Sequence, residues 1–277
     1  MNKIVRGLLD VVLFIIVFFL IQYIASQGVS AVYAWSSGEP WAEISAKLIH
    51  GSFKMSGKLL VAISVLGSVL TMTVFIYTKW SPVSREWLAS RPWKTLTWVV
   101  FMALGSLLPA QWLQEQMNLT LPAGTERLFE AIMSEPVGYL AIGILVPIAE
   151  ELVFRGAILR TLLNLFSKNM HWVAILISAL LFGAVHGNRP QFVHAMLIGL
   201  ILGWMYYRTG SVVPGIVFHW INNTVAYVMF NLMPWISDGK LIDLFHGNSR
   251  TMWLGLVFSL CVFIPSIFQL YLRMKRK

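Results

Sequence analysis

The sequence contains few charged residues and a single cysteine, and both shortages narrow the kinds of protein it can encode. Asp, Glu, Lys and Arg make up 12% of the 277 residues, whereas hydrophobic residues make up 57%. Soluble globular domains carry about a quarter charged residues, so this composition argues against a water-soluble fold. Cys261 lies in an apolar run; with no second cysteine, an intrachain disulfide is impossible and the redox compartment is left open.

The net charge of +9 does not indicate a nucleic-acid partner, because the basic residues are spread through the short loops between apolar runs. Lys and Arg in such loops orient a membrane protein, since they are retained on the cytoplasmic side. Placing both termini in the cytoplasm puts most of the basic residues there. The compact chain with short loops favours a bacterial cell membrane.

The apolar runs are long enough to cross the hydrocarbon core of a bilayer. They predict an all-α fold, a polytopic transmembrane helix bundle of about eight spans. Gly199 and Gly203 form a pair of small residues one turn apart, which lets another helix approach closely. The expected spans are residues 8–26, 58–78, 95–113, 137–166, 172–187, 192–207, 212–233 and 252–272.

Acidic residues inside these runs are costly, and only Asp10, Glu150 and Glu151 fall there. Asp10 lies one turn from Arg6, so we expect a structural ion pair near the membrane surface. Glu150 and Glu151 point about 100° apart on a helix, and Arg155 follows Glu151 on the same face. Glu150 is therefore expected to act as a general base and Glu151 as its orienting partner. The alternative is a buried ion-pair network that only stabilises the bundle.

Two histidines on other helices favour the catalytic interpretation. His186 closes the fifth run, and His219 lies within the seventh with Asn223 one turn later. A lone intramembrane histidine is more often a hydrogen-bonding bridge between helices. Together with the glutamates, these side chains would instead provide a base, a site for water and donors for an oxyanion. His194 is expected to pack between helices.

At these residues the sequence resembles the CPBP family of intramembrane proteases, also called the ABI or CAAX protease family, which includes the Rce-type prenyl endopeptidase. The motif E-E-x-x-x-R is Glu150, Glu151 and Arg155; F-x-x-x-H is Phe182 and His186; H-x-x-x-N is His219 and Asn223. The order and spacing of the three motifs carry the resemblance, which covers about residues 137–233. It divides the chain into N-terminal transmembrane helices (1–136), a catalytic core (137–233), and an outer loop with a C-terminal transmembrane helix (234–277).

The resemblance implies an endopeptidase that hydrolyses a peptide bond of a membrane-associated or lipidated protein. Glu150 and His186 would hold the attacking water, His219 and Asn223 would donate to the oxyanion, and Glu151 and Arg155 would position the base. A non-proteolytic role in binding, regulation or bacteriocin immunity is the alternative within the family. A proton-coupled transporter is a further rival, but the sequence has no inverted repeat of broken helices to support it.

Metal dependence is open at this stage. Glu150, His186 and His219 are a possible zinc ligand set with one open position. The helical H-E-x-x-H spacing is absent, so metal-free glutamate chemistry is favoured and no cofactor is expected. The expected partners are membrane lipid and a membrane-associated or lipidated substrate, with no nucleic acid.

Overall fold

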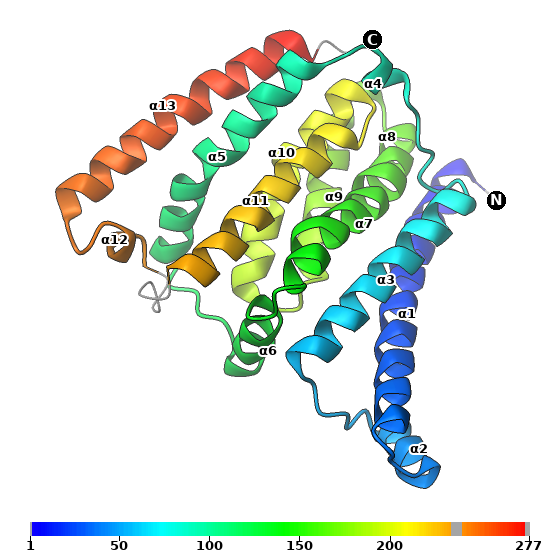
Figure 1. Cartoon of the computed structure of the whole chain (residues 1–277). Helices are drawn as coiled ribbons and strands as arrows, with labels where there is room; N and C mark the ends of the chain where they lie inside the picture. Colours follow the sequence, from blue (N-terminus) through cyan, green and yellow to red (C-terminus); the bar gives the residue numbers. More distant parts are fainter. Residues whose placement is uncertain (1, 234–239, 275–277) are drawn as a thin grey trace.

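The computed structural model describes residues 2–233 and 240–274, and within these ranges every regular element is a helix (Figure 1). The fold class expected from the composition is therefore confirmed as an all-α bundle. The elements are α1 (Lys3–Ser36), α2 (Trp41–His50), α3 (Gly57–Tyr77), α4 (Glu86–Ala89), α5 (Trp93–Gln116), α6 (Ala123–Met133), η1 (Tyr139–Leu145), α7 (Val146–Glu151), η2 (Leu152–Leu159), α8 (Arg160–Leu165), η3 (Lys168–Met170), α9 (His171–Ala184), α10 (Arg189–Thr209), α11 (Val213–Leu232), α12 (Leu241–Leu244) and α13 (Ser249–Arg273).

Each of the eight expected spans coincides with helical structure, although the boundaries differ. The largest difference is α1, which runs for 34 residues, whereas the sequence predicted residues 8–26. Four of the described helices are long and apolar enough to cross a membrane: α1, α3, α5 and α13. The other four stretches are shorter, less apolar or divided, so the number of spans stays a prediction.

The expected span 137–166 is divided into four consecutive helical segments. Wide π-helical turns at Tyr139–Leu145 and Leu152–Leu159 flank the short α-helix Val146–Glu151. Pro147 lies at the start of that α-helix and has no N–H to donate, which interrupts the regular hydrogen bonding. π-Helical turns often occur at functional sites, and here they lie on either side of the glutamate pair.

Small residues bring the central helices together. A Cβ atom at Gly199 would lie 3.0 Å from Ala179 Cβ, and one at Gly203 would lie 2.9 Å from Ile175 Cγ2. These contacts confirm that the glycine pair of α10 is a close-packing face, and its partner is α9. A glycine also allows close packing of α5 against α13, where Gly105 approaches the backbone of Phe263.

The four long apolar helices, α1, α3, α5 and α13, expose much of their apolar surface. Phe258 and Phe268 of α13 are 71% and 60% exposed, and α1 has exposed apolar side chains along most of its length. In a soluble protein such surfaces would aggregate, whereas in a bilayer they contact lipid. The core instead lies where η2, α9, α10 and α11 meet.

One expected contact is absent from the described residues. Asp10 and Arg6 do not lie within ion-pair distance of one another, so the predicted pair was wrong. Arg6 is exposed near the start of α1, and Asp10 is half-buried. Both are near the end of the helix, where water can solvate them separately and leaves little gain from pairing.

Candidate active site

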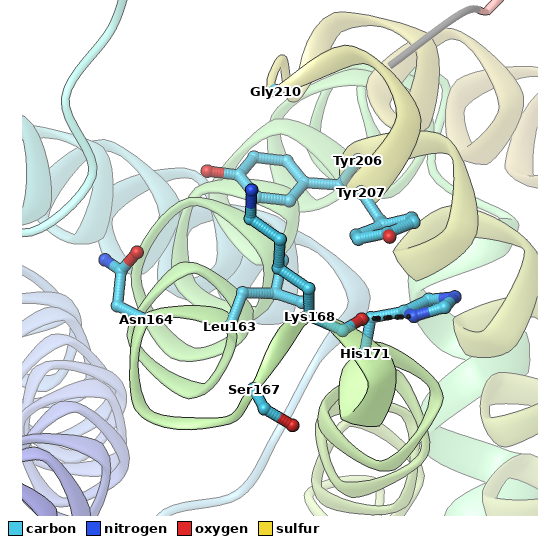
Figure 2. A pocket seen from close by; sticks show the side chains of 8 residues that line it. All are labelled: Leu163, Asn164, Ser167, Lys168, His171, Tyr206, Tyr207 and Gly210. Carbon is cyan, nitrogen blue, oxygen red and sulfur yellow. Dashed lines mark hydrogen bonds between the residues drawn. The ribbon is translucent and has the colours of Figure 1, made fainter. Parts of the chain in front are cut away.

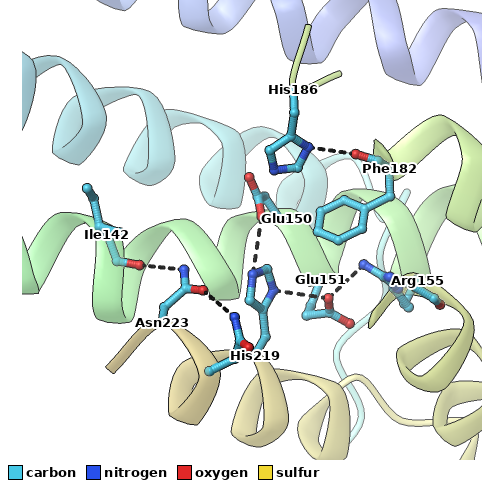
Figure 3. A network of polar contacts seen from close by, with 10 residues as sticks. Ile142, Glu150, Glu151, Arg155, Phe182, His186, His219 and Asn223 are labelled. Atoms are coloured by element: carbon cyan, nitrogen blue, oxygen red, sulfur yellow. Dashed lines mark hydrogen bonds and ion pairs between the residues drawn. The ribbon is translucent and has the colours of Figure 1, made fainter. Parts of the chain in front are cut away.

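The centre of the site is an ion pair between Glu151 and Arg155, one turn apart on the divided helix (Figure 3). Arg155 Nη1 donates to Glu151 Oε1 over 2.7 Å, and both side chains are 0% exposed. Arg155 Nη2 also donates to the carbonyl of Gly199 on α10, at 3.4 Å. Complete burial makes an unpaired charge here very costly, so each side chain depends on the other.

Glu150 and Glu151 lie in different surroundings, as expected from their orientations on the helix. The Glu150 side chain retains 14% exposure, whereas that of Glu151 retains none. Of the two carboxylates, only Glu150 is open to a reactant. This difference is consistent with Glu150 as the reacting carboxylate and Glu151 as the structural one.

His219 of α11 lies between the two carboxylates. Its Nε2 is 3.7 Å from Glu150 Oε2, and its Nδ1 is 3.4 Å from Glu151 Oε1. The Nδ1 contact is close but not aligned as a hydrogen bond. Both ring nitrogens therefore face carboxylate oxygens, and Nε2 lies beside the accessible carboxylate.

His186 is held by the first residue of its own motif. The carbonyl of Phe182 lies 2.9 Å from His186 Nδ1. A carbonyl can only accept, so Nδ1 carries the proton, and Nε2 of the neutral ring is left with a lone pair. His186 lies just beyond the end of α9 and is half-buried, so this nitrogen can act as a base or accept from a water.

The Phe182 ring joins the two imidazoles and the guanidinium. Both histidines lie edge-on to it, with ring centroids 5.3 Å away for His186 and 5.7 Å away for His219. Arg155 Cζ lies 4.4 Å from the ring centroid, within the range of a cation–π interaction. The sequence motif identifies Phe182, but its contacts with all three groups could not be inferred from spacing along one helix.

Asn223 is committed in part to a backbone carbonyl. Its Nδ2 donates to the carbonyl of Ile142 over 3.0 Å. In an α-helix the donor to the Ile142 carbonyl would be the N–H of Val146, but that N–H goes to the Ala141 carbonyl. In a π-helix the donor would be residue 147, which is a proline and has no N–H. The Ile142 carbonyl therefore lacks both of these backbone donors. One amide hydrogen of Asn223 therefore satisfies the interrupted helix, and the second is left for another acceptor.

Gly215 is a component of the site that the sequence did not reveal. A Cβ atom there would lie 2.5 Å from Glu151 Oε2. The absence of a side chain lets α11 approach the divided helix closely enough for His219 to reach both carboxylates. Glycine at this position in an apolar helix is the only sequence signal, and it does not identify the partner.

The proposed zinc ligands do not assemble into a ligand group. Within residues 2–233 and 240–274, no three His, Cys, Asp or Glu side chains are placed to hold a metal ion. Glu150 and His219 are neighbours, both imidazoles lie against the Phe182 ring, and Figure 3 shows Glu150 between His186 and His219. In this arrangement the three possible zinc ligands are not grouped as a ligand set, and the preference for metal-free chemistry stays a prediction.

His194 of α10 belongs to the same neighbourhood. Its imidazole interacts electrostatically with those of His219 and His186. The expectation that it packs between helices agrees with its half-buried position. The structure thus brings together all six expected site residues and Phe182 of the second motif, and it adds Gly215 and the Ile142 carbonyl.

The fold and the site define an integral membrane protein with an accessible carboxylate and two imidazoles in the interior of a helix bundle. Residues 133–225 match the family model described as "Type II CAAX prenyl endopeptidase Rce1-like". This segment is therefore of the CPBP, or CAAX protease, family, as the three motifs within it indicated.

One relative supports the same assignment. The protein named "Putative membrane peptidase YdiL" of Bacillus subtilis (strain 168) is 29% identical over 105 residues, which are 38% of this chain. The match spans 42% of the relative's own length. No solved structure matches the chain significantly.

The contact of Gly215 with Glu151 gives a first prediction. Gly215→Ala forces a methyl group against a fully buried carboxylate, so the free energy of unfolding should fall by about 1–3 kcal/mol. Gly28→Ala, where a Cβ atom meets nothing within 4 Å, is the control and should cause no loss. Glu151→Asp, which shortens the side chain, should cost less in the Gly215→Ala background than in the parent. Thermal unfolding in detergent measures all four stabilities; strict additivity would contradict the contact.

The contact of Asn223 with Ile142 gives a second prediction. Asn223→Ala leaves a carbonyl without a donor, at a cost of about 1–3 kcal/mol. Pro147→Ala restores a backbone N–H near that carbonyl, so Asn223→Ala should cost less in this background. Thermal unfolding of the two single variants and the double variant gives the coupling. An equal cost in both backgrounds would show that Pro147 is not the reason for the Asn223 contact.

Proposed function

We propose that the protein is an intramembrane endopeptidase that hydrolyses a peptide bond of a membrane-associated or lipidated protein. The observation that carries the proposal is the accessible Glu150 carboxylate in contact with His219, in a segment that matches a prenyl endopeptidase family. A purely structural ion-pair network would have no need for a carboxylate that stays open beside the sealed pair.

In the proposed reaction, Glu150 accepts a proton from water while the water oxygen attacks the scissile carbonyl carbon. Nε2 of His186 accepts the second hydrogen bond of that water and holds it in place. The tetrahedral intermediate then breaks its carbon–nitrogen bond. The proton taken up by Glu150 passes to the leaving nitrogen, so the carboxylate is regenerated.

The developing oxyanion would accept hydrogen bonds from His219 Nε2 and from the uncommitted amide hydrogen of Asn223. Donors fixed before the reaction lower the barrier by about 3–4 kcal/mol each in comparable sites. His219 is fixed by its contacts with both carboxylates, and Asn223 by its bond to Ile142. Arg155 and Glu151 act indirectly, as positioning residues for His219.

Exchange of the proposed base is the direct test. Glu150→Gln keeps the shape of the side chain but removes its basicity, so cleavage of a membrane-peptide library should fall by about 10²- to 10⁴-fold. Glu126→Gln, in α6 away from the site, is the matched control and should keep full activity. The measurement is product formation by mass spectrometry with purified protein in lipid vesicles.

A zinc chelator added in parallel distinguishes metal-free catalysis from zinc-dependent catalysis. Metal-free catalysis predicts that wild-type cleavage persists after treatment with a strong zinc chelator. Loss of activity that added zinc restores would overturn the metal-free mechanism. Absence of cleavage by the wild-type protein, or full activity of Glu150→Gln, would favour a binding or regulatory role.

We further propose a bacterial cell membrane with both termini in the cytoplasm. The starts of α1 and α5 and the ends of α3, α8, α10 and α13 lie at one end of the bundle (Figure 1). Contacts of Arg160 with the Trp80 carbonyl and of Arg208 with the Tyr271 carbonyl tie this end together. It carries most of the basic residues, which are retained on the cytoplasmic side.

Cysteine labelling tests this orientation. Cys261→Ser removes the native thiol, and a single cysteine is then placed at Ser84 near the basic end or at Thr125 in α6 near the other. In intact cells, a membrane-impermeant maleimide should label the Thr125→Cys protein and not the Ser84→Cys protein. The opposite pattern would reverse the proposed topology.

A further inference from the structure

A polar cavity lies at the basic end of the bundle, where α8 ends and α9 begins (Figure 2). It has a volume of about 170 Å³, and its lining includes Lys168, His171, Tyr206 and Tyr207. None of its lining residues is acidic. His171 and His186 lie at opposite ends of α9, so this cavity is separate from the candidate active site.

Lys168 supplies an uncommitted positive charge to the cavity. Among the described residues no carboxylate lies within ion-pair distance of its ammonium group, and its side chain is exposed. Figure 2 shows this side chain extending toward Tyr206. An ammonium group without a counterion at the mouth of a polar cavity favours an anionic ligand.

Tyr206 supplies a phenolic hydroxyl. The residue is only 9% exposed and lines the cavity; within the described structure its hydroxyl makes no hydrogen bond, and its oxygen is not among the fully buried atoms, so it can be reached from the cavity. A hydroxyl without a protein partner that faces a cavity is free to donate to a ligand there. Arg160 interacts electrostatically with Tyr206, which adds positive potential on this side.

The first turn of α9 completes the lining. No side chain caps this helix at its N-terminus, and His171, its first residue, borders the cavity. His171 stacks on Tyr207 with ring centroids 4.1 Å apart, and its Nδ1 lies 2.9 Å from the Lys168 carbonyl. The stack and this bond fix the imidazole, and the start of the helix adds the positive end of its dipole.

We propose that this cavity binds a phosphate group, either from the headgroup of an anionic lipid or from free phosphate. An ammonium, a phenolic hydroxyl and an uncapped helix N-terminus are the donors that phosphate oxygens accept from. The surrounding basic residues at this end of the bundle raise the local concentration of anions. They include Lys79, Arg85, Arg91, Lys94, Arg160 and Arg208.

Binding to delipidated full-length protein in nonionic detergent tests the proposal. The probes are short-chain phosphatidylglycerol, short-chain phosphatidylcholine and inorganic phosphate, with affinity measured by calorimetry. Lys168→Gln should weaken phosphatidylglycerol binding by about 10-fold or more, since hydrogen bonds to charged groups contribute about 1.5–3 kcal/mol. Tyr206→Phe should weaken it by about 3-fold or more.

Matched controls distinguish binding in this cavity from nonspecific attraction to surface charge. Lys94→Gln changes an exposed lysine at the same end, and Tyr77→Phe removes a hydroxyl from a tyrosine that is 88% exposed. Both should stay within about 2-fold of the parent. If Lys168→Gln and Lys94→Gln weaken binding equally, or if phosphatidylcholine binds as tightly as phosphatidylglycerol, the proposal is overturned.

Inorganic phosphate distinguishes the two sources. Tight binding of inorganic phosphate that depends on Lys168 would support a free phosphate ligand. Binding of phosphatidylglycerol alone, with the same dependence on Lys168, would support a lipid headgroup. If none of the three probes binds, the cavity is not a phosphate site.

Discussion

The arrangement of this site depends on one ion pair that is closed to solvent. Glu151 and Arg155 are both completely buried, so neither charge could be kept without the other. The guanidinium also contacts the Phe182 ring on α9 and the Gly199 carbonyl on α10. The carboxylate lies against Gly215 of α11. One pair of charges therefore sets the relative positions of four helical segments.

This pair also explains why two adjacent glutamates can have different roles. Glu151 is buried, and Arg155 neutralises its charge. Glu150, the preceding residue, lies on another face of the helix and is still accessible. His219 lies close to both, so its ring faces the accessible carboxylate on one side and the buried one on the other. The buried Glu151–Arg155 ion pair thereby helps to position the accessible Glu150 and His219 beside it.

The sequence predicted the parts of this structure that depend on local composition and spacing. Apolar length located eight helical stretches, and the motif spacing identified six polar residues that lie near one another in the structure (Figure 3), while their catalytic roles stay a prediction. It did not predict the π-helical turns, the extent of α1 or the partner of Gly215. Those features depend on contacts between helices far apart in the chain: Asn223 compensates an interruption that Pro147 creates 76 positions earlier. No pattern within one helix records such a pairing.

The position of the site in the membrane follows from the length of α9. This helix begins at the polar cavity with His171 and ends just before His186, after 14 residues or about 21 Å. Ser178 fixes its middle to the divided helix by donating to the Phe154 carbonyl over 2.9 Å. If the cavity holds a headgroup phosphate at the basic face and α9 runs along the membrane normal, His186 lies near the middle of a hydrocarbon core about 30 Å thick. Under the proposed function, a scissile bond would then have to enter the site from within the bilayer, which favours substrates anchored in the membrane over soluble ones.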